Sequence, residues 1–75
     1  MTLEFQVLFT SGIERKYFVD ASACANFEEA KGVVDSILTF YEQFVNGEHD
    51  NCVFTFNNWR IDAAHVAAIS GQARR

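Results

Sequence analysis

The sequence predicts an α+β fold of the order ββαββ. Two β-hairpins would form a mainly antiparallel sheet of four or five strands, with one long amphipathic helix packed on one face. Three observations predict this fold: apolar and polar residues alternate over 2–10, apolar residues recur at helical spacing over 26–47, and apolar pairs match across an Asn57-Asn58 turn.

The length and composition indicate a single globular domain that spans residues 1–75. Hydrophobic residues make up 49% of the chain and aromatic residues 15%, which is too many for a disordered segment. A core of this size rarely supplies more than about 3–5 kcal/mol of stability. We therefore expect a further source of stability, and the sequence points to oligomerisation.

The charged residues argue against direct binding of nucleic acid. The formal net charge is −4, and the basic residues are scattered along the chain apart from the terminal pair Arg74-Arg75. Nucleic-acid binding depends on clustered Lys and Arg side chains that displace counterions. No such cluster is present in the rest of the sequence.

The sequence predicts a cytoplasmic protein that does not enter a membrane. No apolar run reaches the length of a signal peptide or a membrane span. Cysteines in a reducing compartment stay reduced, so Cys24 and Cys52 are predicted to be free, buried thiols.

Residues 2–20 are predicted to form the first hairpin. Odd positions from 3 to 9 are apolar, only Leu8 breaks the alternation, and Ser11-Gly12 marks the turn. A two-residue loop would place apolar residues opposite charged ones, so we expect a three-residue loop with Gly12 in a left-handed bulge. Leu8 and Phe18 then lie on the opposite face. The predicted pairs are Phe9 with Arg15, Val7 with Tyr17 and Phe5 with Val19.

The helix predicted within residues 26–47 has both of its ends marked in the sequence. Asn26 is a suitable N-cap, and Glu29 three residues later completes a capping-box pattern. Asn46-Gly47 supplies the C-terminal stop. Gly32 lies inside the helix, where it costs about 1 kcal/mol relative to Ala. It either marks a close approach of another backbone or is merely tolerated.

The apolar arc of this helix is wider than one packing surface needs. At about 100° per residue its apolar side chains fill roughly 160°, whereas about 100° covers one core. We expect the side with Val33, Ile37, Phe40 and Phe44 to pack on the chain's own sheet. The other side, together with the exposed face of the first hairpin, is predicted to pair two copies as a homodimer. The predicted interface residues are Leu8, Phe18, Leu38, Tyr41 and Val45.

The second hairpin is predicted around a two-residue Asn57-Asn58 turn. This turn pairs Phe56 with Trp59, Phe54 with Ile61 and Cys52 with Ala63, all on one face. Two interpretations of the next segment remain open. We favour one turn at 63–65 followed by a strand over 66–70. The alternative is a two-turn helix that begins at Asp62 and stops at Gly71.

The segment FNNWRIDAAHVAAI (56–69), which follows a long helix, resembles the C-terminal parts of small ββαββ proteins that are common in phages and prophages. In those proteins a polar residue follows a short strand, and a His-hydrophobic pair and a closing Ile come next. The resemblance implies the ββαββ fold and a phage-like protein, and it carries over no catalytic residue.

No residue pattern predicts a catalytic, cofactor or metal site. His49 and Cys52 form an H-x-x-C pair that Cys24 and His65 could complete as zinc ligands, but only this one pair is closely spaced. A reactive thiol needs a nearby base or a helix N-terminus, and Cys24 lies just before the predicted helix. No oxyanion loop accompanies it, so we predict that the protein is not an enzyme.

Glu28, Asp35 and Glu42 recur every seven residues and form an acidic row on the polar side of the helix. The row could imitate a nucleic-acid backbone, or it could be the solvated back of the helix, interrupted by Lys31. The function we predict is a non-catalytic, self-associating module that binds an unidentified protein. The alternatives are an acidic inhibitor of a nucleic-acid-binding protein, as phages encode against host defences, and a minor enzyme or accessory subunit.

Overall fold

The computed structural model describes residues 1–75 and has the predicted α+β fold. Two hairpins flank a long helix, and a fifth strand closes the chain. The elements are β1 (Thr2–Phe9), β2 (Glu14–Asp20), α1 (Phe27–Val45), β3 (Val53–Phe56), β4 (Trp59–Asp62), the short 3₁₀ helix η1 (Ala63–His65) and β5 (Val66–Arg74). The ββαββ prediction is therefore confirmed.

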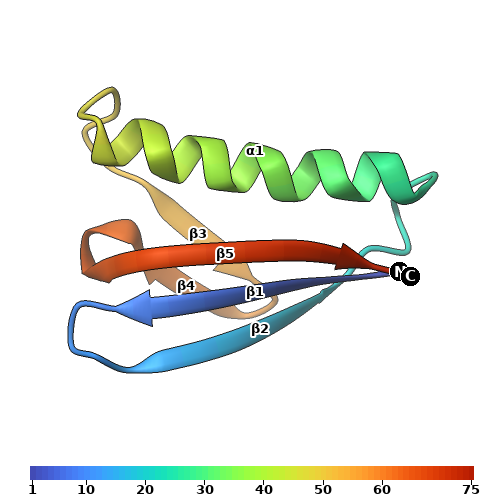
Figure 1. Ribbon diagram of the computed structural model, residues 1–75, viewed down its shortest axis with the longest axis horizontal. Coiled ribbons are helices and arrows are strands. Elements are labelled where there is room, and N and C mark those ends of the chain that lie inside the picture. The colour runs from blue at the N-terminus through green and yellow to red at the C-terminus, as the bar shows by residue number, and fades with distance from the viewer.

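The strands are divided between two antiparallel sheets instead of lying in one. The larger sheet has the order β2-β1-β5, and β3 and β4 form a two-stranded sheet. In Figure 1, β5, β1 and β2 lie in front, the β3–β4 hairpin lies behind them and α1 runs above. The separation has a packing reason: the ring of Phe56 stacks on that of Phe5 at 4.6 Å, so the second hairpin covers the first sheet and does not extend it.

The β1–β2 hairpin has the predicted faces, but the predicted register is wrong by two residues. The observed pairs include Leu3 with Val19, Phe5 with Tyr17 and Val7 with Arg15. The loop runs over 10–12, one residue earlier than predicted, because Phe9 N–H donates to Ile13 O at 2.8 Å. Gly12 has a φ of 91°, as the predicted left-handed bulge requires.

The ends of α1 are formed as predicted. The Asn26 side chain accepts a hydrogen bond from Glu29 N–H at 2.8 Å, and the Glu29 carboxylate accepts one from Ala25 N–H at 3.2 Å. Gly47, with a φ of 83°, follows the C-terminus of the helix. Neither α1 nor η1 has the length and apolarity that crossing a lipid bilayer requires.

The β3–β4 hairpin has the predicted register, with Phe56 opposite Trp59 and Phe54 opposite Ile61. Asn57 adopts the positive φ of 55° that the turn needs, and its amide donates to Phe18 O at 2.7 Å. The preferred interpretation of the next segment is also confirmed, because η1 is one turn and a strand follows it. That strand, β5, continues to residue 74, beyond the predicted end at 70.

The core lies between the inner face of the β2-β1-β5 sheet and a layer made by α1 and the β3–β4 hairpin. Phe56 lies at its centre and stacks on Phe5, on Tyr17 at 5.3 Å and on Phe54 at 6.0 Å. The buried residues are Leu3, Phe5, Val7, Tyr17, Ala21, Ala30, Val34, Cys52, Phe54, Phe56, Ile61, Ala63 and Val66. No polar residue is buried in this core.

The close packing expected of a glycine occurs at Gly71 and not at Gly32. A Cβ atom at Gly32 would meet nothing within 4 Å, so this glycine is tolerated on the open side of α1. A Cβ atom at Gly71 would lie 2.8 Å from a ring carbon of Phe5 and 3.0 Å from a methyl group of Val34. Gly71 therefore lets α1 pack closely on β5.

Candidate protein-binding surface

The helix α1 faces the core with a different side from the one predicted. Ile37 and Phe44 pack against the core as expected, and Leu38 and Tyr41 join them. Val33 and Phe40 are 38% and 41% exposed, so the prediction was wrong for these two residues. Two contacts with β5 set this rotation.

The first of these contacts is a hydrogen bond that the Tyr41 hydroxyl donates to Val66 O at 2.9 Å. Burial raises the pKa of this hydroxyl, and the nearby Cys52 adds to the effect, so Tyr41 stays protonated as a donor. The second contact is the close approach of Val34 to Gly71. Together they turn α1 toward β5 and leave its other flank, with Val33 and Phe40, facing solvent beside β3.

An apolar hollow lies between this flank of α1 and β3, and we call it the α1–β3 hollow. It has a volume of about 380 Å³. Its lining residues are Ser36, Ile37, Phe40, Val53, Phe54, Thr55 and Phe56. All four residues of β3 line the hollow, and no residue of β4 does. Because β4 is the only strand that pairs with β3, the floor of the hollow is the other, unpaired edge of β3.

Local sequence rules explain why the rim of this hollow is apolar. Side chains alternate along β3, so Phe54 and Phe56 enter the core and Val53 points outward. Val53 is 43% exposed, close to the values for Val33 and Phe40. Two large exposed apolar side chains, Phe40 and Val53, therefore border a single hollow, and the exposed Val33 lies about two helical turns before Phe40 on the same flank of α1. Exposed apolar groups of this kind mark a protein-interaction site.

His49 holds the Phe40 ring at one side of the hollow. The two rings stack with their centroids 4.3 Å apart and their planes 20° apart. His49 Nε2 is also 2.9 Å from Gln43 Oε1, one turn further along α1, which fixes the imidazole against the helix. A partly exposed aromatic side chain that is held in one position loses little conformational freedom on binding, as an anchor residue requires.

The five predicted interface residues fall into two groups. Leu8, Phe18 and Val45 are exposed, and Phe18 and Val45 are more than half accessible to solvent. Leu38 and Tyr41 are half-buried against the core of their own chain. The outer face with Leu8 and Phe18 is mixed, because the polar pair Gln6 and Lys16 lies between them. Their role in self-association stays a prediction.

Both cysteines are free, and neither lies in a cluster that suits a metal ion. Cys52 is buried, and Cys24 is half-buried. Burial, with a smaller contribution from the carboxylate of Asp62, raises the pKa of the Cys52 thiol, which keeps it protonated. No group of three or more Cys, His, Asp or Glu side chains converges so as to hold a metal ion, so Cys24, His49, Cys52 and His65 do not come together.

The acidic row is fully solvated. Glu28, Asp35 and Glu42 are all exposed on α1. The Lys31 ammonium lies 3.8 Å from the Glu28 carboxylate, and neither of the other two carboxylates has an ion-pair partner. Exposed pairs of this kind contribute little to stability.

Comparison with protein-family models, with curated proteins and with solved structures finds no match. The resemblance of 56–69 to phage and prophage proteins therefore stays a prediction.

Proposed function

We propose that this protein is a small, non-catalytic module that self-associates and binds another protein in the α1–β3 hollow. The observation that carries this proposal is that the exposed side chains of Phe40 and Val53 both line one apolar hollow beside an unpaired strand edge. An apolar side chain of the partner that enters the hollow would cover Phe40 and Val53, and interface residues contribute most to affinity when they are fully desolvated.

Three further properties support the proposal. The buried thiol of Cys52 is held protonated, which does not suit a nucleophile. The net charge of −4 and the dispersed basic residues favour a protein partner over a nucleic acid. Free thiols at Cys24 and Cys52 would persist in a reducing cytoplasm, where we place the protein.

Site-specific photocross-linking tests the proposed binding site. The photoreactive amino acid benzoylphenylalanine is placed at Phe40 in the full chain, which is then irradiated in the cells that produce it. Matched copies carry it at Phe18 or Trp59, which are exposed aromatic positions outside the hollow. We expect a second protein to be captured from position 40 and from neither control. Capture of the same proteins from all three positions would contradict the proposal.

A charge substitution tests the contact with the captured protein. Val53→Asp, which places a carboxylate on the rim of the hollow, should weaken binding of the purified partner at least about tenfold. Ile13→Asp, at an exposed apolar residue just after the β1–β2 loop, should leave binding unchanged. Binding that survives Val53→Asp but is lost in Asp35→Asn/Glu42→Gln, or in about 0.5 M salt, would instead support the acidic inhibitor.

A further inference from the structure

The strand β5 presents the longest open edge of the molecule. It is nine residues long and ends the larger sheet, so its only strand partner is β1. The opposite edge of that sheet is β2, and it is partly covered, because the Asn57 side chain donates a hydrogen bond to the backbone carbonyl of Phe18. β5 contains no proline, and its single charged residue, Arg74, is paired with Glu4 at 3.4 Å. The strand β5 itself therefore has neither a proline nor an unpaired charge that would oppose the addition of another strand.

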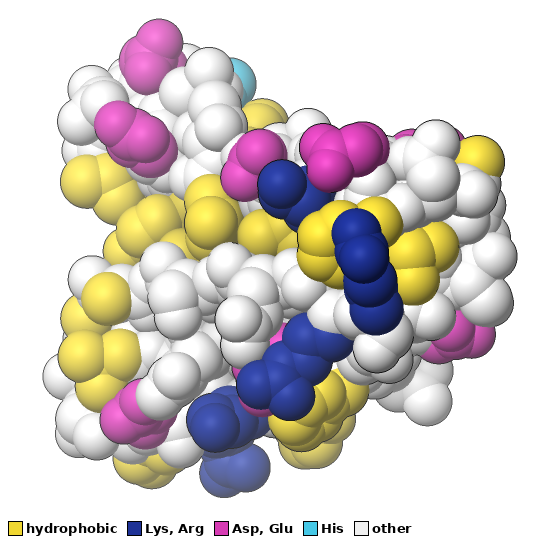
Figure 2. All heavy atoms as spheres, turned by 45° about the vertical axis from the view of Figure 1, so that its right-hand side comes forward, with side chains coloured by type: hydrophobic (Ala, Val, Ile, Leu, Met, Phe, Trp, Pro, Cys, Tyr) yellow, Lys and Arg dark blue, Asp and Glu magenta, His cyan; other side chains and the backbone are white.

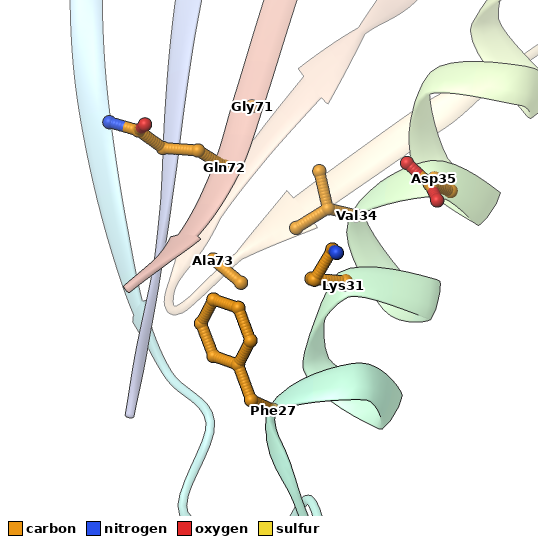
Figure 3. Close-up of a pocket in the computed structure, with 7 residues that line it drawn as sticks. All are labelled: Phe27, Lys31, Val34, Asp35, Gly71, Gln72 and Ala73. Atoms are coloured by element: carbon orange, nitrogen blue, oxygen red, sulfur yellow. The ribbon is translucent and has the colours of Figure 1, made fainter. Parts of the chain in front are cut away.

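A small cavity lies beside this edge, between α1 and the second half of β5. It has a volume of about 250 Å³ and is lined by Phe27, Lys31, Val34, Asp35, Gly71, Gln72 and Ala73. In Figure 3, Phe27 and Val34 point from the helix toward β5, whereas Gln72 points away to the outer face. Figure 2 shows hydrophobic side chains in the furrow between α1, at the top, and the sheet below it.

We infer that β5 of a second copy pairs antiparallel with this edge, centred on Ser70. This inference rests on the self-association proposed above and identifies the strand that mediates it. In this register Ile69 of each copy lies opposite Gly71 of the other, and Ala67 lies opposite Ala73. Directly opposite residues in antiparallel strands point to the same face of the sheet. Ile69 and Gly71 both belong to the inner face, since they pair with Val7 and Phe5 of β1.

The side chain of Ile69 therefore points toward the cavity that Gly71 borders in the other copy. Gly71 has no side chain of its own to offer there, because a Cβ atom would collide with Phe5. Centring the pair on Ile69 would place Ile69 opposite itself, and centring it on Gly71 would place Ile69 opposite the side chain of Ala73. Of these registers, only the one about Ser70 sets the larger residue opposite the residue that has no side chain, so that Ile69 meets the neighbouring cavity with no Cβ atom between them. This match identifies a second copy of the chain as the occupant.

The same register brings the two helices together on one face of a six-stranded sheet. Leu38 and Val45 continue, at intervals of seven residues, the row that begins at Lys31 beside the cavity. This flank of each α1 faces the other copy, so the exposed Val45 would be covered.

Disulfide trapping tests this arrangement. Cys24 is first replaced with Ser. In the proposed register, Ser70→Cys then places the thiols at position 70 of the two copies opposite each other on the exposed outer face. Gln72→Cys is the matched control on the same strand, since its two thiols would lie about 13 Å apart. Lys16→Cys is the control on the opposite edge strand, β2. Under mild oxidation we expect Ser70→Cys to form covalent dimers at least about tenfold faster than either control, because a disulfide needs close Cβ atoms.

Four outcomes would overturn the inference. Faster trapping of Lys16→Cys would place the contact on β2, and equal rates for all three variants would indicate random collisions. If Ser70→Cys is trapped slowly although the protein has twice the single-chain mass, the two copies associate through another surface. That result would contradict the β5 pairing but would leave the proposed self-association and partner binding intact. A protein with the mass of one chain would contradict self-association itself. Circular dichroism confirms that each exposed substitution leaves the fold intact.

Discussion

Replacing Phe56 with Ala is expected to leave most of the protein unfolded at 25 °C. Phe56 is 1% exposed and contacts the rings of Phe5, Tyr17 and Phe54, so it joins the second hairpin to the first sheet. Removing a buried Phe side chain costs about 3–5 kcal/mol. A core of this size supplies about the same amount in total. Urea denaturation followed by circular dichroism at a fixed protein concentration measures the loss.

The matched control is Trp59→Ala. Trp59 lies directly opposite Phe56 in the hairpin, but it is 60% exposed, and its one aromatic pairing is an edge-on contact with Tyr17. We expect this substitution to lower the free energy of unfolding by less than about 1 kcal/mol, as is usual for exposed sites. If the two variants were equally stable, Phe56 would not be the centre of the core.

Replacing Gly71 with Ala is expected to lower the free energy of unfolding by about 1–3 kcal/mol, as overpacking of a core does. The new methyl group would lie 2.8 Å and 2.9 Å from two ring carbons of Phe5 and 3.0 Å from Val34. Phe5 cannot move aside easily, because it is fully buried and stacked on Phe56. The same urea titration measures the effect.

The control for this prediction is the same substitution at Gly32. A Cβ atom there would meet no neighbour within 4 Å, and the residue lies inside α1. Gly32→Ala should therefore raise the free energy of unfolding by about 0.5–1 kcal/mol, because Ala favours the helix. Opposite signs at the two glycines would support close packing of α1 on β5, and a stabilising Gly71→Ala would refute it.

Features that depend on local sequence could be predicted, and the structure confirms them. Asn26 and Glu29 form the N-terminal cap of α1, and Asn57 turns the second hairpin in the expected register. In the cap and in the turn, the groups that interact belong to residues only a few positions apart in the sequence, so the sequence alone identifies them. Local sequence was less decisive after Asp62, where a two-turn helix and one turn followed by a strand both stayed open. The Asp62 side chain accepts a hydrogen bond from Ala64 N–H at 3.0 Å, and the structure has the favoured single turn.

Features that depend on packing between distant residues could not be predicted. A shift of two residues in the first hairpin keeps every side chain on its face, so alternation cannot distinguish the predicted register from the observed one. The rotation of α1 depends on contacts with Gly71 and Val66, which lie far away in the sequence. The hollow was missed for this reason, although Val53, an apolar residue on the outward face of an alternating strand, was the available signal.

Two separate surfaces emerge on either side of α1. One flank meets β3 and forms the hollow where we propose that a partner binds, and the other flank lies beside the open edge of β5. A dimer formed through β5 would leave the hollow of each copy accessible. A dimer with two identical partner sites would bind more tightly to a partner that is itself an oligomer, because both sites could be occupied at once.

The solution mass tests the central claim, self-association, most directly. Sedimentation equilibrium at micromolar concentration and physiological salt should give twice the single-chain mass of 8.5 kDa. Dilution should return the protein toward the single-chain mass, because strand pairing over nine residues forms a reversible contact. A mass of 8.5 kDa that stays constant up to about millimolar concentration would contradict the claim.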